Sequence, residues 1–232
     1  MVEVDVVYQR VLAIANKEQR GYVTPLEFNL LANQAQMDIF EQYFYDKNQN
    51  ERLRGNDTDY SDIGDILNEK ISLFEVNDFW IGDGSIGNFP QNLYRLGSVT
   101  NGLGGPEAEY LDRKDFIYVM SSPLTRPTNK RPIYIRDRNS GVKVYGDNGV
   151  QITTNIYCNY IRTPDKVTWG YVVTNKKALY LPGDSTDFNH HRADETRLVM
   201  KILELAGVVI NKPGLVQIAD QEDLKKIQQE KA

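Results

Sequence analysis

A glycine-rich stretch is the first part of this sequence whose residue types could do chemistry. Residues 82–87 match the G-x-G-x-x-G pattern of dinucleotide-binding loops letter for letter, after a strand-like run of apolar residues. In those loops a helix begins directly afterwards, because its N-terminal N–H groups must reach the pyrophosphate. Here Pro90 and a further short strand follow, which leaves no room for that helix. The pattern favours a loop without a ligand, and a small nucleotide-dependent module that uses Gly82–Gly87 is kept as an alternative.

A second pattern matches part of a calcium-binding loop. Asp46, Asn48, Asn50 and Asp57 occupy positions 1, 3, 5 and 12 of the calcium-loop template. The template also needs Gly at position 6 and Glu at position 12, whereas this sequence has Glu51 and an aspartate there. The segment is therefore better explained as a helix that ends in a polar linker.

The only two histidines of the chain are adjacent, at His190 and His191, and acidic residues flank them. Adjacent side chains point apart on a helix or a strand, so both cannot bind one metal ion without a third segment. Ser185 has no G-x-S-x-G elbow around it, and Cys158, the single cysteine, cannot form a zinc cluster. We predict a protein that is not an enzyme, with no catalytic, cofactor-binding or metal-binding residues. A metal-dependent module at His190 and His191 is kept as an alternative.

Charge is distributed unevenly in a chain whose 27 basic and 32 acidic residues give a net charge of −5. Residues 57–78 carry seven acidic residues and one basic residue, while residues 126–143 carry six basic residues and one acidic residue. Opposite patches can pair head to tail between copies, and such contacts close into a ring when the rotation allows. The candidate interface residues of this kind are Asp57, Asp59, Asp62, Asp65, Arg126, Lys130, Arg131, Arg136 and Arg138.

The basic segment has two other interpretations that the sequence leaves open. Its charges could keep the edges of a hairpin soluble. Alternatively, Tyr134 and Tyr145 lie among the basic residues and could stack on the bases of a single-stranded nucleic acid. Sequence-independent binding of duplex DNA is not expected, because the protein as a whole is acidic.

The elements that must position these residues begin with two predicted helices. Apolar residues follow an i, i+3, i+4 stripe over Val4–Lys17. Thr24, Pro25 and Glu27 then have the types and spacing of a capping box, so a second helix is predicted from Pro25 to about residue 45.

Apolar residues cover more than half of the circumference of this second helix. A helix that packs on one neighbour needs a narrower stripe. We expect it to lie between its own core and either the first helix or another subunit, and Phe40 and Phe44 are added to the candidate interface residues.

The middle of the chain is predicted to be a small antiparallel β domain. Short runs rich in Ile, Val, Thr and Tyr alternate with turn clusters, and Asn148-Gly149 is a typical hairpin turn. The predicted strands are 93–99, 116–120, 132–136, 142–145, 151–161 and 166–173.

The C-terminal part is predicted to be helical again. One helix begins between Ser185 and Asp194 and ends at Gly207, and another covers residues 215–229. The fold class is therefore α+β, with helical parts that pack together. Its predicted parts are an N-terminal helical hairpin (1–55), an acidic and glycine-rich arm (56–88), the β domain (89–182) and a C-terminal helical segment (183–232).

Two blocks of the sequence resemble known virion proteins. The first is Arg10–Phe44, and the second is Asp184–His191 with its continuations at residues 195–208 and 215–219. Both are similar to the ends of a group of tailed-bacteriophage virion proteins, most of all those of crAss-like phages that infect Bacteroides-type hosts. Residues 50–180 show no such resemblance.

The resemblance implies a structural head–tail connector: a neck or adaptor ring of about twelve copies below the portal. It implies that the partners are copies of the chain itself, the portal protein and other neck or tail proteins. Double-stranded DNA would only pass through the ring, without sequence-specific contact. The implied location is the virion, after synthesis in the host bacterial cytoplasm. This agrees with the absence of a basic secretory n-region and of any apolar run near ~18 residues. No catalytic residue, ligand residue or cofactor comes with the resemblance.

Overall fold

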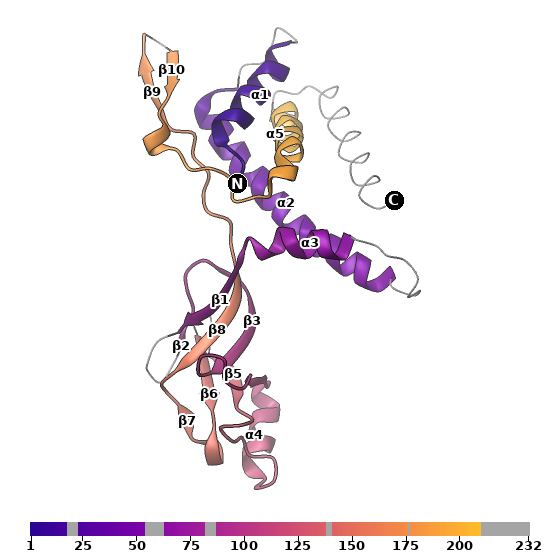
Figure 1. Cartoon of the computed structure of the whole chain (residues 1–232), viewed down its shortest axis with the longest axis vertical. Helices are drawn as coiled ribbons and strands as arrows, with labels where there is room; N and C mark the ends of the chain where they lie inside the picture. The colour runs from indigo at the N-terminus through magenta and orange to yellow at the C-terminus, as the bar shows by residue number, and fades with distance from the viewer. Residues whose placement is uncertain (18–22, 54–62, 82–86, 138–140, 176, 210–232) are drawn as a thin grey trace. The chain divides into compact units, whose positions relative to one another are not determined.

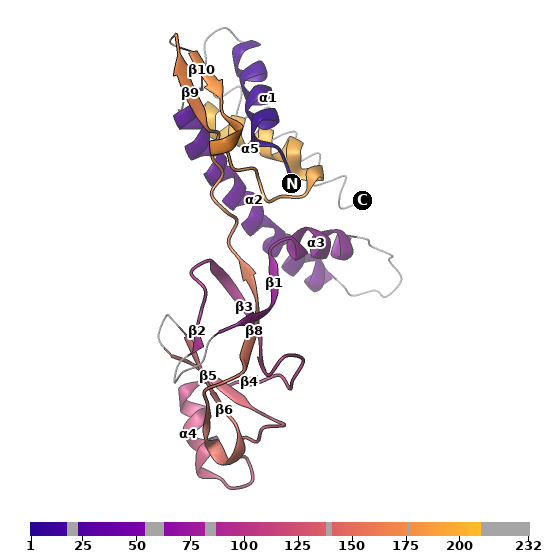
Figure 2. The ribbon, with the colours of Figure 1, turned by 60° about the vertical axis from the view of Figure 1, so that its left-hand side comes forward.

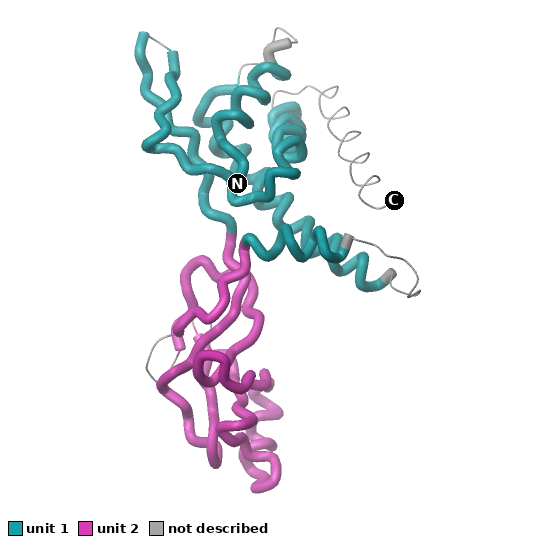
Figure 3. The backbone as a smooth tube through the Cα atoms, viewed as in Figure 1, with its two compact units in different colours: residues 1–73, 164–232 teal, residues 74–163 magenta. Residues whose placement is uncertain are grey.

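A computed structural model of the chain describes residues 1–17, 23–53, 63–81, 87–137, 141–175 and 177–209. The chain forms two compact units (Figures 1 and 3). The helical unit consists of residues 1–73 and 164–232, and the sheet unit consists of residues 74–163. The predicted α+β class is confirmed.

The helical unit contains four α-helices and one hairpin among its described residues. The helices are α1 (Val4–Lys17), α2 (Pro25–Leu53), α3 (Ile63–Ser72) and α5 (Glu195–Val209). The hairpin consists of β9 (Tyr171–Thr174) and β10 (Lys177–Tyr180), and two short 3₁₀ helices, η2 (Pro182–Asp184) and η3 (Arg192–Asp194), precede α5. The helix α1 has the predicted bounds, whereas α2 is longer than predicted and α5 continues through Gly207.

The start of α2 is the predicted capping box. The Thr24 backbone N–H and hydroxyl both donate to the Glu27 carboxylate, at 2.9 and 2.8 Å, and the Glu27 N–H donates to the Thr24 hydroxyl at 3.3 Å. These hydrogen bonds to Thr24 lower the pKa of Glu27. The flanking Val23 and Phe28 are both buried, as expected for a hydrophobic staple.

Aromatic contacts join the N-terminal helix α1 to a segment that lies far away in the sequence. The ring centroid of Tyr8 on α1 lies 4.6 Å from that of Phe28 and 4.4 Å from that of Trp169. The Trp169 indole N–H donates to Asp5 at 2.9 Å. Residues near the N-terminus therefore fix a segment that follows the whole sheet unit in the sequence.

Much of the wide apolar face of α2 is used inside the chain, although Leu30 is 67 % exposed. This helix packs against both α3 and α5. Phe40 has no exposed surface and Phe44 is 8 % exposed. The prediction that these two phenylalanines contact another subunit is wrong, because the second and third neighbours that the wide face needs come from the same chain.

The sheet unit contains two small sheets. The first has the order β1-β8-β3, from β1 (Glu75–Trp80), β8 (Ile156–Arg162) and β3 (Leu93–Asn101), and it is antiparallel throughout. The second has the order β2-β6-β5-β4, with β7 also paired to β6. Its strands are β2 (Gly87–Asn88), β6 (Gly141–Tyr145), β5 (Ile133–Asp137), β4 (Glu109–Tyr110) and β7 (Gln151–Ile152).

Both sheets contribute to one hydrophobic core. Val99 and Cys158 come from the first sheet, and Val142 and Val144 come from the second. Burial raises the pKa of the Cys158 thiol to about 11, so this cysteine stays protonated as a core residue. The predicted turn at Asn148-Gly149 joins β6 and β7, and both of its residues have positive φ.

One predicted strand is a helix instead. Residues 116–120 lie in α4 (Arg113–Ser121), where the centroid of the Phe116 ring lies 4.7 Å from that of the Tyr145 ring. A short run of consecutive apolar residues has no period that separates strand from helix. The prediction therefore followed composition, which does not distinguish a strand from a helix here.

The unit boundaries also differ from the predicted domain boundaries. The strand β1 and the helix α3 lie in the predicted arm 56–88, and β1 belongs to the sheet unit because it pairs with β8. The hairpin β9–β10 lies in the predicted β domain but belongs to the helical unit. The predicted helix 215–229 lies outside the described residues. Among those that are described, no helix is long and apolar enough to cross a membrane.

Candidate functional site

The two predicted loop patterns do not form a site in the described part of the chain. Residues 82–86 of the glycine-rich pattern lie outside it, and Gly87 starts β2. Asp46, Asn48 and Asn50 lie within α2, and Asp46 accepts a hydrogen bond from Gln42 one turn earlier, at 3.0 Å. A helix cannot fold around an ion as a calcium loop does, so this interpretation is not supported.

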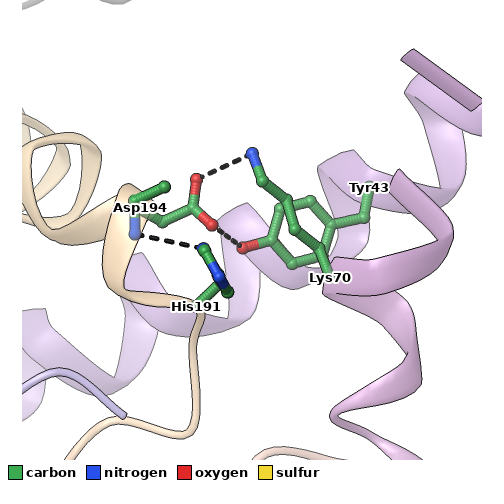
Figure 4. Close-up of polar contacts among 5 residues, drawn as sticks. Tyr43, Lys70, His191 and Asp194 are labelled. Atoms are coloured by element: carbon green, nitrogen blue, oxygen red, sulfur yellow. Dashed lines mark hydrogen bonds and ion pairs between the residues drawn. The ribbon is translucent and has the colours of Figure 1, made fainter. Parts of the chain in front are cut away.

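The two histidines have different roles. His191 is the N-cap of η3, where its Nδ1 accepts a hydrogen bond from the Ala193 N–H at 3.2 Å (Figure 4). His190 is fully buried, and its ring centroid lies 5.8 Å from that of Tyr43. Within the described residues, no three His, Cys, Asp or Glu side chains are grouped so that they could hold a metal ion.

His190 belongs to a buried polar cluster that we define as Tyr43, Lys70, His190 and Asp194. The Asp194 carboxylate accepts a hydrogen bond from the Tyr43 hydroxyl at 2.9 Å and forms an ion pair with the Lys70 ammonium at 3.1 Å (Figure 4). Asp194 has no exposed surface, and Lys70 is 4 % exposed. The ammonium also lies 5.8 Å from the centroid of the Tyr43 ring. The cluster therefore joins α2, α3 and the segment that precedes α5.

Burial has a measurable consequence for His190. It is the main reason why the pKa of this imidazole falls from 6.5 to about 4. The negative charge of Asp194 and a hydrogen bond with the Gln36 backbone act in the opposite direction, whereas the positive charges of Arg197 and Lys70 lower the pKa further. At neutral pH the imidazole is uncharged inside the helical unit.

This buried cluster is suited to holding the fold together and not to turning over a substrate. A general acid or base must come within hydrogen-bond reach of the atom that it serves. His190 and Asp194 have no surface that solvent reaches. What the arrangement can do is fix three helices at one point, since an ammonium and a carboxylate taken out of water must stay together.

A second polar arrangement lies along α2 and was missed by the sequence analysis. Asn29 forms two hydrogen bonds with the backbone of Trp169, and Asn33 forms two with the backbone of Val167. Gln36 donates to the Asp165 carbonyl at 2.7 Å. Four residues of a helix advance by about 6 Å, which is close to the advance of two residues in an extended chain. The side-chain amides of α2 therefore replace a neighbouring strand for the segment 164–170, which we call the strap.

We expect Asn33→Ala to destabilise the helical unit by about 2 kcal/mol, because the buried N–H and C=O of Val167 lose their partners. Urea denaturation followed by Trp169 fluorescence in a Trp80→Phe background measures this free energy of unfolding. The matched control is Asn48→Ala, at an exposed position of the same helix, which should change it by less than about 0.5 kcal/mol. Equal effects of the two substitutions would show that the strap is not held by Asn33.

The charged candidate interface residues lie on the surface where they are described. Asp65 is exposed in the first turn of α3, and Arg126, Lys130, Arg131 and Arg136 are exposed in the sheet unit. Asp57, Asp59, Asp62 and Arg138 lie outside the described residues. Three of the basic side chains have contacts in the chain itself. The Arg126 Nε–H donates to the Met120 carbonyl at 3.0 Å, Arg131 pairs with Glu109 at 3.0 Å, and Arg136 lies 5.6 Å from the centroid of the Tyr110 ring.

Two elements expose apolar side chains that the sequence analysis did not select. The helix α4 has no buried residue, and it exposes Ile117 and Tyr118; Leu124, just beyond it, is 97 % exposed. The hairpin β9–β10 exposes Val172, Val173 and Leu179. In a small monomer these apolar side chains would lie against water, which is unfavourable. Contiguous exposed apolar residues mark contact surfaces.

The sequence interpretation placed residues 166–173 in a single strand of the β domain. The structure assigns the first part of that range to the strap and the second part to β9.

No protein-family model matches the chain, and no curated protein matches its sequence.

Proposed function

We propose that this chain is a non-enzymatic structural subunit of a tailed-phage virion, which forms a homo-oligomeric ring at the portal–tail junction and lets DNA pass. The observation that carries the proposal is the exposure of apolar side chains on both units, on α4 and on the hairpin β9–β10. Neighbouring subunits in a ring would cover such surfaces.

The positions of the two phage-like blocks support the proposal. Residues 10–17 of the first block belong to α1 and residues 25–44 to α2, and residues 184–208 of the second block belong to the segment that ends in α5. These blocks are far apart in the sequence but fold together in the helical unit, whereas the sheet unit is formed entirely by the stretch without that resemblance. A shared helical part with a different inserted sheet unit is what this division suggests.

The direct test is cryo-electron imaging of the virus particle that carries this chain. We expect a closed ring of its copies on the particle axis, between the portal and the tail. Particles in which the chain is absent, or lies away from that axis, would overturn the proposal.

The electrostatic part of the proposal has its own test. Reversal of Asp59, Asp62 and Asp65 to lysine should weaken ring assembly, since these acidic residues would face the basic surface of a neighbour. The matched control changes Glu3, Glu41 and Asp184, which are exposed acids elsewhere on the helical unit, to lysine. Both variants change the net charge equally, so rings that form equally well from both would remove the acidic segment from the interface.

The rival class, a nucleotide- or metal-dependent module, is tested by a thermal-shift panel of nucleotides and divalent cations. A specific ligand at 100 times its Kd stabilises a protein by ~2.7 kcal/mol, which is a readily measured shift of Tm. We expect no shift with any of them. A clear shift, abolished by substitutions within Gly82–Gly87 or of His191, would replace the structural proposal. Strong salt-dependent binding of an oligonucleotide would instead favour the single-strand binder.

A further inference from the structure

The hairpin β9–β10 is a sheet of only two strands in the part of the chain that the structure describes (Figures 1 and 2). Its register is regular from Lys177 opposite Thr174 to Tyr180 opposite Tyr171, without a bulge. Each strand therefore has one edge paired and one outer edge. Two-stranded sheets are at best marginally stable in water unless another strand or a helix covers them.

The register also shows which backbone groups reach the outer edges. The Leu181 N–H donates to the Gly170 carbonyl at 2.9 Å, so this pair is a hydrogen-bonded pair of the antiparallel ladder. Hydrogen-bonded and non-hydrogen-bonded pairs alternate along such a ladder. Val173 and Ala178, which face each other three positions further along, therefore form a non-hydrogen-bonded pair whose N–H and C=O groups point outward.

The edge of β9 lacks the features that keep an edge strand from pairing. Natural edges carry charges, prolines or bulges, whereas β9 reads Tyr-Val-Val-Thr. All four of its residues are exposed; Val172 and Val173 are 49 % and 63 % exposed. Leu179, which faces Val172 on β10, is 54 % exposed.

The base of the hairpin is fixed although its edges are open. Trp169, which is buried, stacks on Tyr171 and Tyr180 with ring centroids 5.7 and 5.6 Å apart. The strap that precedes β9 is bonded to α2 through Asn29 and Asn33. A fixed base reduces the conformational entropy that a partner strand must overcome, which favours binding.

We infer that the outer edge of β9 pairs with the outer edge of β10 from a second copy of this chain, by antiparallel strand addition. The inference rests on the proposed function and names one of its subunit contacts. The ladder within one chain already shows that the two strands are complementary, because Val172 faces Leu179 and Val173 faces Ala178. The same register between copies again places apolar residues opposite apolar residues on both faces.

The two outer edges differ, and this determines the symmetry. A contact of a β9 edge with another β9 edge would end at a dimer, whereas a β9 edge on a β10 edge leaves one free edge of each kind for the next copy. Such a heterologous contact propagates and closes into a ring when the rotation allows. In the closed ring, this contact leaves no outer edge of a β9–β10 hairpin unpaired.

A proline at position 173 tests the inference, since it removes an outward N–H without removing a hydrogen bond of the hairpin itself. We expect Val173→Pro to abolish assembly of the full-length protein in analytical ultracentrifugation and electron microscopy, while near-ultraviolet circular dichroism stays unchanged. The matched control Val173→Thr keeps the N–H and the β-branched shape, and it should assemble like the wild type. Rings formed by Val173→Pro as readily as by the wild type would overturn the inference and leave the proposed ring function in place.

Disulfide trapping tests the same contact without relying on stable rings. In a Cys158→Ala background, a copy with Val173→Cys is mixed with a copy with Ala178→Cys under mild oxidation. We expect a cross-linked pair of the mixed type, because the two Cα atoms would lie within disulfide range across the new ladder. A mixture with no excess of mixed pairs over identical pairs would overturn the inference. Mixed pairs between the two cysteine variants, together with a wild-type protein that never forms rings, would support the strand contact and count against the ring function.

Discussion

Replacing Lys70 with alanine is expected to destabilise the helical unit by about 3–5 kcal/mol. The substitution leaves the Asp194 carboxylate in the interior without the Lys70 ammonium, although it still accepts a hydrogen bond from the Tyr43 hydroxyl at 2.9 Å. Asp194 has no exposed surface, so water cannot replace the lost ammonium without opening the fold. Urea denaturation monitored by Trp169 fluorescence in a Trp80→Phe background gives the free energy of unfolding of this unit.

The matched control is Lys201→Ala. Lys201 pairs with Glu204 at 2.9 Å, a similar distance, but both side chains are more than a fifth exposed. Ion pairs of that kind contribute about 0.5 kcal/mol or less. A loss at Lys70 no greater than the loss at Lys201 would contradict the burial of the pair.

A double variant separates two causes of the lost stability: the Asp194 charge left without the ammonium, and the packing contacts of the lysine side chain. Lys70→Met combined with Asp194→Asn removes both charges but keeps an oxygen that can accept from Tyr43. We expect it to recover at least half of the loss caused by Lys70→Ala, since a buried ion pair replaced by neutral groups of similar size is often close to neutral in stability. Hydrogen exchange of the α3 amides should be faster in Lys70→Ala than in the double variant, because Lys70 connects that helix to the segment before α5.

Local signals in the sequence predicted the local structure well. The capping box at Thr24 and Glu27 and the apolar stripe of α1 depend on residues within one or two turns, and both were found. The turn at Asn148-Gly149 was found for the same reason, since a positive φ needs particular residue types.

What the sequence could not predict depends on partners distant in the chain. Asn29 and Asn33 have the spacing of a solvent-facing pair on a helix, and nothing near them reveals that Trp169 and Val167 will be their partners. Lys70 likewise counted as a lone base in an acidic segment, although it pairs with Asp194, which is 124 residues away. The face of α2 was correctly described as too wide for one neighbour, but its pattern alone could not distinguish a neighbouring subunit from α3 and α5.

The stability of the helical unit is expected to fall by about 3 kcal/mol as the pH is lowered from about 6.5 to about 4. The pKa of His190 is about 4 in the folded chain against 6.5 for an ordinary histidine. In this range the unfolded chain binds a proton at this position and the folded chain does not, so protonation favours unfolding. Each pKa unit corresponds to about 1.4 kcal/mol, which gives the expected size. Above the pKa of this histidine in the unfolded chain, its contribution to the free energy of unfolding is fully present. Below its pKa in the folded chain, that contribution is lost.

Unfolding measured by urea at several pH values between 4 and 7.5 checks this, with His190→Gln as the test variant. The carboxylates of the protein also titrate near the lower end, so the informative quantity is the difference in slope between the wild type and the variant from about pH 6.5 down to pH 5. His190→Gln should reduce that slope, whereas His191→Asn, which keeps an acceptor for the Ala193 N–H at η3, should not. Since the neutral imidazole lies beside Asp194 and the ring of Tyr43, an unchanged slope in His190→Gln would mean that this side chain is hydrated in the folded protein. The buried cluster would then be open to water, and the expected cost of Lys70→Ala would fall with it.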